Sequence, residues 1–170
     1  MGSQNFRIGA VKAWFKGRYL GHTLGGATIA YEPDIVDMMA DQFGTSPVDK
    51  AVKGEKVTVT LPLAEDTIEN WADAIPAGTV AGGTDGRLEV GSNAGKRLGE
   101  SAGELILHPL AFADDDASYD IVLHKAVSGD SVEIGKNNED QMVIEIKFSA
   151  LVDETQEDGN WLFHVGDSTD

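Results

Sequence analysis

The most regular pattern in the chain lies between Gly54 and Leu63, where apolar and polar residues alternate. Alternation with a period of two predicts a β-strand with one buried face and one exposed face. The apolar face of this strand consists of Val57, Val59, Leu61 and Leu63. The opposite face consists of Lys56, Thr58 and Thr60.

A helical pattern follows directly after this strand. Four apolar residues at the i, i+3, i+4 and i+7 positions share one helix face, namely Ile68, Trp71, Ala72 and Ile75. Asp66 is expected to cap the first turn, with Glu69 three residues later as in a capping box, and Pro76 is expected to end the helix. The sequence therefore predicts one short helix packed on the sheet. Its expected anchors are Ile68, Trp71 and Ile75.

Short alternating runs elsewhere in the chain predict further strands. The expected ranges are 8–16 and 25–31, taken as a first pair, and then 105–108, 119–127, 132–134, 142–150 and 161–165. Short strands between turn residues, with a single clear helix, predict a mainly β fold of the sandwich or barrel-like type. The length of 170 residues is consistent with one domain that covers residues 1–170.

Two long connections and an acidic end interrupt this strand pattern. Residues 33–53 are expected to form a loop, because Gly44 and Pro47 exclude a long helix. This segment is nevertheless rich in apolar residues, which we expect to serve assembly: Ile35, Val36, Met38, Met39 and Phe43. Residues 77–103 form a glycine-rich connection in which Leu88 and Val90 mark a short strand, and residues 153–170 form an acidic C-terminal segment.

The distribution of charge is uneven along the chain. The formal net charge is −16, which disfavours nucleic-acid binding through phosphate contacts. The first 31 residues contain no acid and four basic residues, whereas the rest contains 9 basic and 29 acidic residues. Either these are solvated surfaces, or the basic segment complements an acidic surface of another copy. The basic residues are Arg7, Lys12, Lys16 and Arg18.

The sequence contains no convincing motif for catalysis or for a cofactor. The stretch GSNAGKR at 91–97 lacks the spacing and the hydroxyl residue of a phosphate-binding loop, and the aspartates at 114–116 lack the register of an EF-hand. The four histidines are scattered, cysteine is absent, and no GxSxG motif occurs. We therefore expect no enzyme activity, metal or cofactor. The sequence shows neither a membrane span nor a signal peptide, which indicates folding in a cytoplasm.

The order of these elements resembles the tail tube, or major tail, proteins of long-tailed bacteriophages. The resemblance rests on a first strand with the glycine-bearing turn YLGHTLGGATIAY, a long connection, and the strand-then-helix segment VKGEKVTVTLPLAEDTIENWADAI. It covers most of the chain. The secreted ring protein of bacterial contractile injection systems is a related alternative, and a ligand-binding β-sandwich module is another.

The resemblance implies a structural virion protein without enzyme activity. Members of that family form hexameric rings that stack into a tube, through which DNA passes without specific binding. Lys56, Thr58 and Thr60 would then face the channel or a neighbouring subunit, and residues 33–53 would connect stacked rings. The expected partners are further copies of this chain and the tape measure, tail tip and terminator proteins. Assembly would take place in the host cytoplasm, with no membrane involved.

Overall fold

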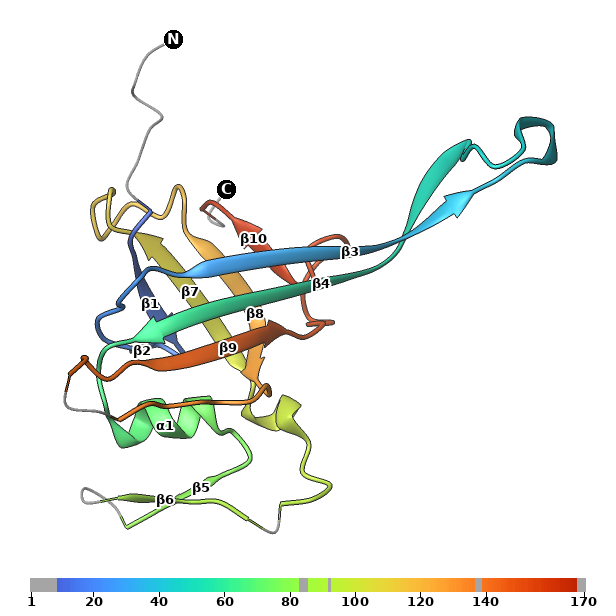
Figure 1. Ribbon diagram of the computed structural model, residues 1–170. Coiled ribbons are helices and arrows are strands. Elements are labelled where there is room, and N and C mark those ends of the chain that lie inside the picture. Colours follow the sequence, from blue (N-terminus) through green and yellow to red (C-terminus); the bar gives the residue numbers. More distant parts are fainter. Residues whose placement is uncertain (1–8, 83–85, 92, 137–138, 168–170) are drawn as a thin grey trace.

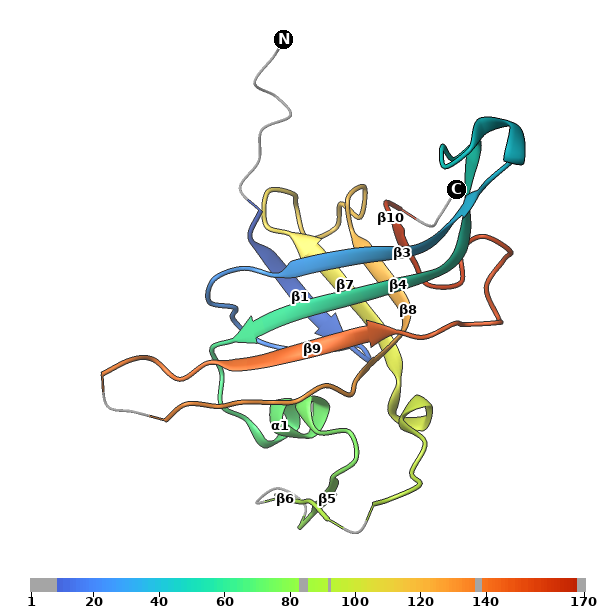
Figure 2. The same cartoon turned by 45° about the vertical axis from the view of Figure 1, so that its right-hand side comes forward.

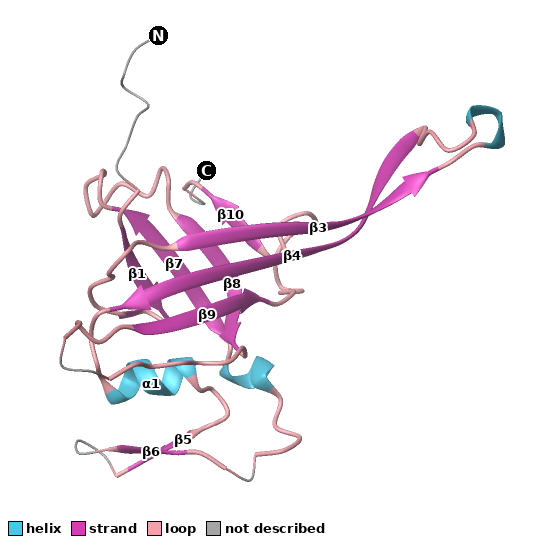
Figure 3. Ribbon diagram, viewed as in Figure 1, coloured by secondary structure: helices cyan, strands magenta, loops and turns pink. Residues whose placement is uncertain are grey.

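The computed structural model describes residues 9–82, 86–91, 93–136 and 139–167, and its fold is mainly β (Figures 1 and 3). The strands are β1 (Val11–Phe15), β2 (Arg18–Tyr19), β3 (Thr28–Met38), β4 (Asp49–Leu63), β5 (Thr79–Ala81), β6 (Arg87–Glu89), β7 (Gly103–Pro109), β8 (Ile121–Ser128), β9 (Ile144–Ala150) and β10 (Phe163–Val165). One α-helix, α1 (Ile68–Ala74), and two 3-10 turns, η2 (Asp41–Phe43) and η4 (Leu98–Ser101), complete the described elements. The expected mainly β fold with one short helix is confirmed.

Eight strands form a single antiparallel sheet that bends into two layers. The strand order is β2-β1-β7-β8-β9-β4-β3, and β10 adds to β8. The bend occurs at β8, because residues 126–128 pair with β9 while residues 121–123 pair with β10. Strands β3, β4 and β9 therefore lie across β1, β7 and β8, as Figures 1 and 2 show. The result is a sandwich-like fold with open edges at β2 and β3.

The hydrophobic core lies between these two layers. The four apolar residues predicted on β4, from Val57 to Leu63, are completely buried, which confirms the alternation. Phe15 of β1 meets Phe148 of β9 across the layers, with ring centroids 4.8 Å apart. Leucines of β7 and β8 fill the rest of this space. Burial of apolar surface here is the main source of stability.

Helix α1 begins one residue later than the sequence pattern suggests. The cap is Thr67, whose Oγ1 accepts a hydrogen bond from the backbone N–H of Asn70 at 3.2 Å. Asp66 instead accepts a hydrogen bond from the Trp71 indole N–H at 2.6 Å, so the predicted Asp66 cap is wrong. Hydroxyl and carboxylate caps are close in strength, and sequence pattern alone does not separate neighbouring candidates. Ile75 ends the helix before Pro76, as predicted.

The buried face of α1 differs from the predicted apolar face. Asn70 and Ala74 are its buried residues, and Trp71 and Ile75 are partly buried against the core. Ile68 is 40% exposed, so its predicted role as an anchor is wrong within the subunit. The cause is Asn70, whose side-chain amide donates hydrogen bonds to the carbonyls of Leu20 and Glu65, both at 3.1 Å. These bonds rotate a polar residue, rather than Ile68, into the interface.

Residues 33–53 are not a loop, in contrast to the sequence-based expectation. Strands β3 and β4 continue as a two-stranded antiparallel arm that projects beyond the sandwich, and only residues 39–48 connect them (Figures 1 and 2). A β-bulge interrupts the pairing between Asp34 and Ile35. Bulges increase local twist, and the arm twists away from the body in this region (Figure 1).

Two further expectations about strands need correction. The first two predicted strands do not pair, because β1 pairs with β2 and β7, whereas β3 pairs with β4. Residues 132–134 form no strand, although Val132 and Ile134 pack against the core. The predicted strand at Leu88 is present as β6, and its partner β5 was not expected. The remaining predicted strands, at 105–108, 119–127, 142–150 and 161–165, correspond to β7, β8, β9 and β10.

The contrast between the two halves of β4 yields a prediction about stability. Leu61→Ala in the buried half should lower the free energy of unfolding by about 2–5 kcal/mol, because it leaves a cavity in a closed core. Val52→Ala in the exposed half should change it by less than about 0.5 kcal/mol. Urea unfolding monitored by circular dichroism measures both. Equal losses for the two variants would contradict the division of β4 into core and arm.

Candidate assembly surfaces

The arm exposes the five apolar residues that the sequence marked for assembly. Their side chains are 48–62% exposed, and Val48 and Val52 add to the same surface. Pairing places Ile35 opposite Val52 on one face of the arm and Val36 opposite Ala51 on the other. Both faces of the arm therefore carry apolar groups. The five residues concerned are Ile35, Val36, Met38, Met39 and Phe43.

The shaft of the arm is held by main-chain pairing and by ion pairs between its strands. Beyond the bulge, four consecutive residue pairs join β3 and β4, from Ile35–Val52 to Met38–Asp49. The Lys50 ammonium lies 2.7 Å from the Asp37 carboxylate, directly across the ladder. Lys53 lies 3.7 Å from Asp34 at the bulge. Exposed ion pairs contribute little stability, yet they reduce the charge of the shaft.

The tip of the arm has a defined backbone conformation. The 3-10 turn at Asp41–Phe43 is closed by the Phe43 N–H, which donates to the Ala40 carbonyl at 3.0 Å. The Val48 N–H donates to the Met38 carbonyl at 2.8 Å and closes the base of this turn. Gly44 follows with φ of 64°, a left-handed conformation that glycine adopts without strain. The tip therefore presents Phe43 from a fixed turn.

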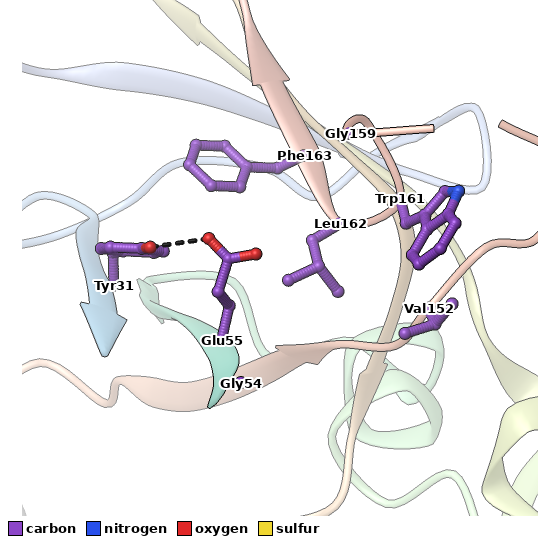
Figure 4. A pocket seen from close by; sticks show the side chains of 8 residues that line it. All are labelled: Tyr31, Gly54, Glu55, Val152, Gly159, Trp161, Leu162 and Phe163. Carbon is purple, nitrogen blue, oxygen red and sulfur yellow. Dashed lines mark hydrogen bonds between the residues drawn. The ribbon is translucent and has the colours of Figure 1, made fainter. Parts of the chain in front are cut away.

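A pocket of about 310 Å³ lies at the base of the arm. Tyr31, Gly54 and Glu55 line it from β3 and β4, and the C-terminal segment lines it with Val152, Gly159, Trp161, Leu162 and Phe163. Figure 4 shows Tyr31 and Glu55 on one side of the space and Leu162, Trp161 and Val152 on the other. Most of this lining is aromatic or aliphatic. The pocket could not be predicted from sequence patterns, because its two halves are about a hundred residues apart along the chain.

One hydrogen bond organises the polar side of this pocket. The Tyr31 hydroxyl donates to a Glu55 carboxylate oxygen at 2.7 Å. This bond, more than burial or the nearby charge, raises the pKa of the Tyr31 hydroxyl. Tyr31 therefore stays neutral at physiological pH and holds the Glu55 carboxylate to one side. The pocket thus has an apolar interior with one fixed acidic group.

The predicted channel- or neighbour-facing residues share the outer face of the β3–β4–β9 layer. Lys56 is exposed and Thr58 and Thr60 are half-buried, on the side of β4 opposite the core. The register places Glu32 across from Lys56 and Lys147 beside Thr60. This face is polar and carries charges of both signs.

The basic segment is mostly engaged inside the subunit. Lys12 forms an ion pair with Asp114. Arg18 forms an ion pair with Asp73 and donates to the Asn70 side-chain oxygen at 3.0 Å. Lys16 is exposed, with its ammonium 5.0 Å from the centre of the Phe15 ring. Arg7 lies outside the described residues.

Burial and pairing act in opposite directions on Asp73. Burial raises the pKa of the Asp73 carboxyl, although the ion pair with Arg18 lowers it. Burial is the larger effect, so removing Arg18 would leave a costly buried carboxylate. Arg18 is therefore required by its own subunit and is a poor reporter of contacts between subunits.

Two histidines that the sequence left scattered come together beside β10. His124 of β8 and His164 of β10 lie with Nε2 and Nδ1 3.3 Å apart, and His124 Nε2 lies 3.0 Å from the Asn160 side-chain oxygen. They line a polar hollow of about 580 Å³ with Glu104, Glu157 and Asp167. Within the described residues, no group of three or more His, Asp or Glu side chains is arranged to hold a metal ion.

The remaining buried histidine has a structural partner. His108 Nδ1 lies 2.6 Å from the Asp120 carboxylate, which ties β7 to the turn before β8. Its Nε2 is buried without a hydrogen-bond partner among the described residues.

Comparison with known proteins found no matching family model and no matching curated protein. No helix in the described part of the chain has the length and apolar character needed to cross a membrane.

The histidine pair predicts a pH dependence of stability. Burial, and then the proximity of His124, lowers the pKa of His164, so the folded chain favours its neutral form. An unfolded histidine has a pKa of about 6.5, so the unfolded chain binds more protons below that pH. The free energy of unfolding should therefore fall as pH decreases from about 7 toward 5. Urea unfolding across this range measures the effect.

His164→Gln is the matched variant for this measurement, because it cannot titrate. Its stability should fall less steeply over the same pH interval, and the difference between the two slopes isolates His164 from the other histidines. Glu104 of β7 raises the pKa of His164 and limits the effect. Parallel slopes for the two proteins would show that His164 does not contribute.

Proposed function

We propose that this chain is a structural subunit that polymerises into a tube, in the manner of the tail tube proteins it resembles. In this proposal hexameric rings stack into a channel for DNA within a virion tail, after assembly in a host cytoplasm. The other tail proteins would join the tube at its ends and in its lumen. The observation that carries the proposal is the projecting arm with apolar side chains on both faces.

An arm of this kind is poorly suited to a free monomer. Soluble monomers rarely expose large contiguous apolar surfaces, and such surfaces typically bind another molecule. A two-stranded hairpin alone is marginally stable in water, so contacts with a partner would also stabilise it. The arm has no partner element among the described residues of its own subunit beyond its two strands. Contact with another copy would remove this apolar surface from water.

The open edges of the sheet support lateral contacts between copies. Strand β3 is the last strand in the sheet order, and β2 is the first. An edge strand has unpaired backbone groups that can pair with another chain. Pro33 within β3 is consistent with an edge, because proline lacks the N–H needed in a central strand. Edge pairing between neighbours would extend the sheet around a ring.

The charge of the subunit is consistent with a channel for DNA. The subunit's net charge of −16 repels the phosphate backbone, so DNA would pass through the tube without specific binding, although the candidate lining face carries charges of both signs. The outer face of the β3–β4–β9 layer, with Lys56, Thr58 and Thr60, has no large apolar side chain and would line the channel or a ring contact. Mixed charges on this face would keep it hydrated.

Removing the arm should abolish assembly and leave the subunit folded. Replacing residues 35–53 with Asn-Gly connects the pair Asp34–Gly54 through a two-residue hairpin turn. The variant should keep a cooperative urea-unfolding transition and lie within about 1 kcal/mol of the parent in unfolding free energy, because the core is unchanged. Electron microscopy should show rings or tubes for the parent only. Tubes of the shortened chain would refute a role of the arm in assembly.

A point variant separates the apolar contact from the length of the arm. Phe43→Asp places a charge on the tip, and Val90→Asp makes a comparable change at a similarly exposed site outside the arm. Both variants lower the net charge by one. Only Phe43→Asp should block polymerisation, as measured by light scattering.

The charge asymmetry can be tested at Lys16, which is exposed, once circular dichroism shows that the variant is folded, because the Lys16 ammonium also helps to keep Asp73 ionised. Lys16→Glu should slow assembly at low salt if this exposed cation meets an acidic surface of a neighbour. Arg87→Glu on β6 is the control, because it changes the net charge by the same amount. The difference should disappear at high salt, because the screening length falls from about 10 Å at 0.1 M to about 3 Å at 1 M ionic strength. Identical kinetics of the two variants at low salt would show that the basic segment is only a solvated surface.

A further inference from the structure

The tip of the arm and the pocket at its base are complementary in character. The tip presents Met38, Met39, Phe43 and Val48, each more than half exposed. The pocket has Leu162 and Phe163 in its lining and exposed Trp161 and Val152 beside them. We propose that this pocket receives the Phe43 tip of a second copy of the chain. The inference rests on the proposed polymerisation and names the receiving site for it.

The tip cannot enter the pocket of its own subunit. Met38 near the tip lies seven positions along β3 from Tyr31 at the pocket, about 23 Å at roughly 3.3 Å per residue. Cross-strand pairing runs along this whole distance apart from one bulge, so the arm cannot fold back on itself. Figure 1 shows the tip far from the strands at the arm base. The occupant must therefore come from another copy.

The tip is prepared for docking because its conformation is already fixed. Hydrogen bonds from the N–H groups of Phe43, Ser46 and Val48 close the turn that carries the Phe43 ring. A preformed turn loses little conformational entropy on binding. The pocket volume of about 310 Å³ can hold an aromatic ring together with part of a methionine side chain. Tyr31 keeps the Glu55 carboxylate hydrogen-bonded at one side of this space.

The size of this contact favours a polymer over an isolated dimer. A large aromatic residue buries about 150–250 Å². The four apolar tip residues together would bury on the order of 500 Å², compared with roughly 800 Å² per partner in a standard stable interface. One tip in one pocket is therefore too small to hold two copies firmly. A polymer gains stability because each copy both gives a tip and receives one.

The geometry of tip and pocket also determines the kind of assembly. The two surfaces differ and lie at opposite ends of the same arm, so the contact is head-to-tail. A head-to-tail contact leaves one free tip and one free pocket after each addition, and growth continues unless a ring closes. The same contact therefore fits stacked rings along a tube.

The first test changes the pocket and leaves the tip intact. Val152→Asp places a charge in the apolar lining, and Val165→Asp makes the same change at an exposed valine of β10 outside that lining. Val152→Asp should raise the protein concentration needed for polymerisation at least about tenfold, whereas Val165→Asp should not. Polymerisation of Val152→Asp at the parental concentration would overturn the pocket assignment.

Mixing two defective variants tests the direction of the contact. Phe43→Asp retains a pocket, and Val152→Asp retains a tip. Each alone should stay monomeric, and the mixture should form one-to-one dimers at high concentration but no polymer, because one productive contact leaves no matching pair. Size-exclusion chromatography with light scattering resolves these species. Long polymers in the mixture would contradict a single head-to-tail contact.

A cross-link gives a direct readout that does not depend on polymer formation. The chain has no cysteine, so Gln42→Cys in one copy and Val152→Cys in another provide the only two thiols. A short bismaleimide should join them, whereas Val90→Cys in place of Val152→Cys should give no product. A cross-link in a protein that forms no tubes would support the tip–pocket contact and contradict the proposed tube. Tubes without a cross-link would support the tube and contradict the tip–pocket contact. Absence of both would overturn both.

Discussion

Strand β4 runs without a break from the exposed arm into the buried core, and the arrangement of the molecule depends on this continuous strand. In its C-terminal half, the apolar side chains from Val57 to Leu63 are completely buried between the layers of the sandwich. Its N-terminal half forms one side of the exposed arm. Because a strand transmits its direction along the backbone, the packing of the buried half sets the direction of the arm. An arm attached through a flexible loop would lack this fixed orientation.

A polar junction beside the core holds the helix against the strands. The side-chain oxygen of Asn70 accepts a hydrogen bond from Arg18, and its side-chain nitrogen donates to two backbone carbonyls. Both polar atoms of this buried amide therefore have hydrogen-bond partners. Arg18 also pairs with Asp73, which burial would otherwise tend to protonate. Such a network adds less stability than apolar packing of the same volume. It restricts α1 to one rotation, since any other rotation would leave buried polar groups unpaired.

Sequence patterns predicted the elements that are determined by interactions between residues close together in the sequence. Alternation identified the buried residues of β4, and capping and proline signals placed α1 to within two residues. The rotation of α1 was not predictable, because it depends on hydrogen bonds between Asn70 and residues up to 52 positions away. Turn-forming residues made 33–53 look like a loop, although the strands on either side continue into it.

The candidate sites show the same division between local and distant information. The apolar residues of the arm were visible in the sequence, because a single segment carries all of them. The pocket was not visible, since Tyr31 and Trp161 meet only through the pairing of β4, β9, β8 and β10. The histidines of β8 and β10 are 40 positions apart and meet for the same reason. Sequence patterns therefore identify the tip of the arm but not the surface that receives it.

Charge and apolar contact have opposite effects on any assembly of this chain. Copies with a net charge of −16 repel one another at long range, and salt reduces that repulsion. The arm lowers the opposing charge locally, because Asp37 pairs with Lys50 and Asp34 with Lys53. An apolar tip at the end of a shaft with paired charges can reach a neighbour before the bulk of the two bodies comes close. The projecting arm keeps the bodies of two copies apart while its tip makes contact. Short-range apolar attraction can therefore act where the long-range repulsion between the bodies is weaker.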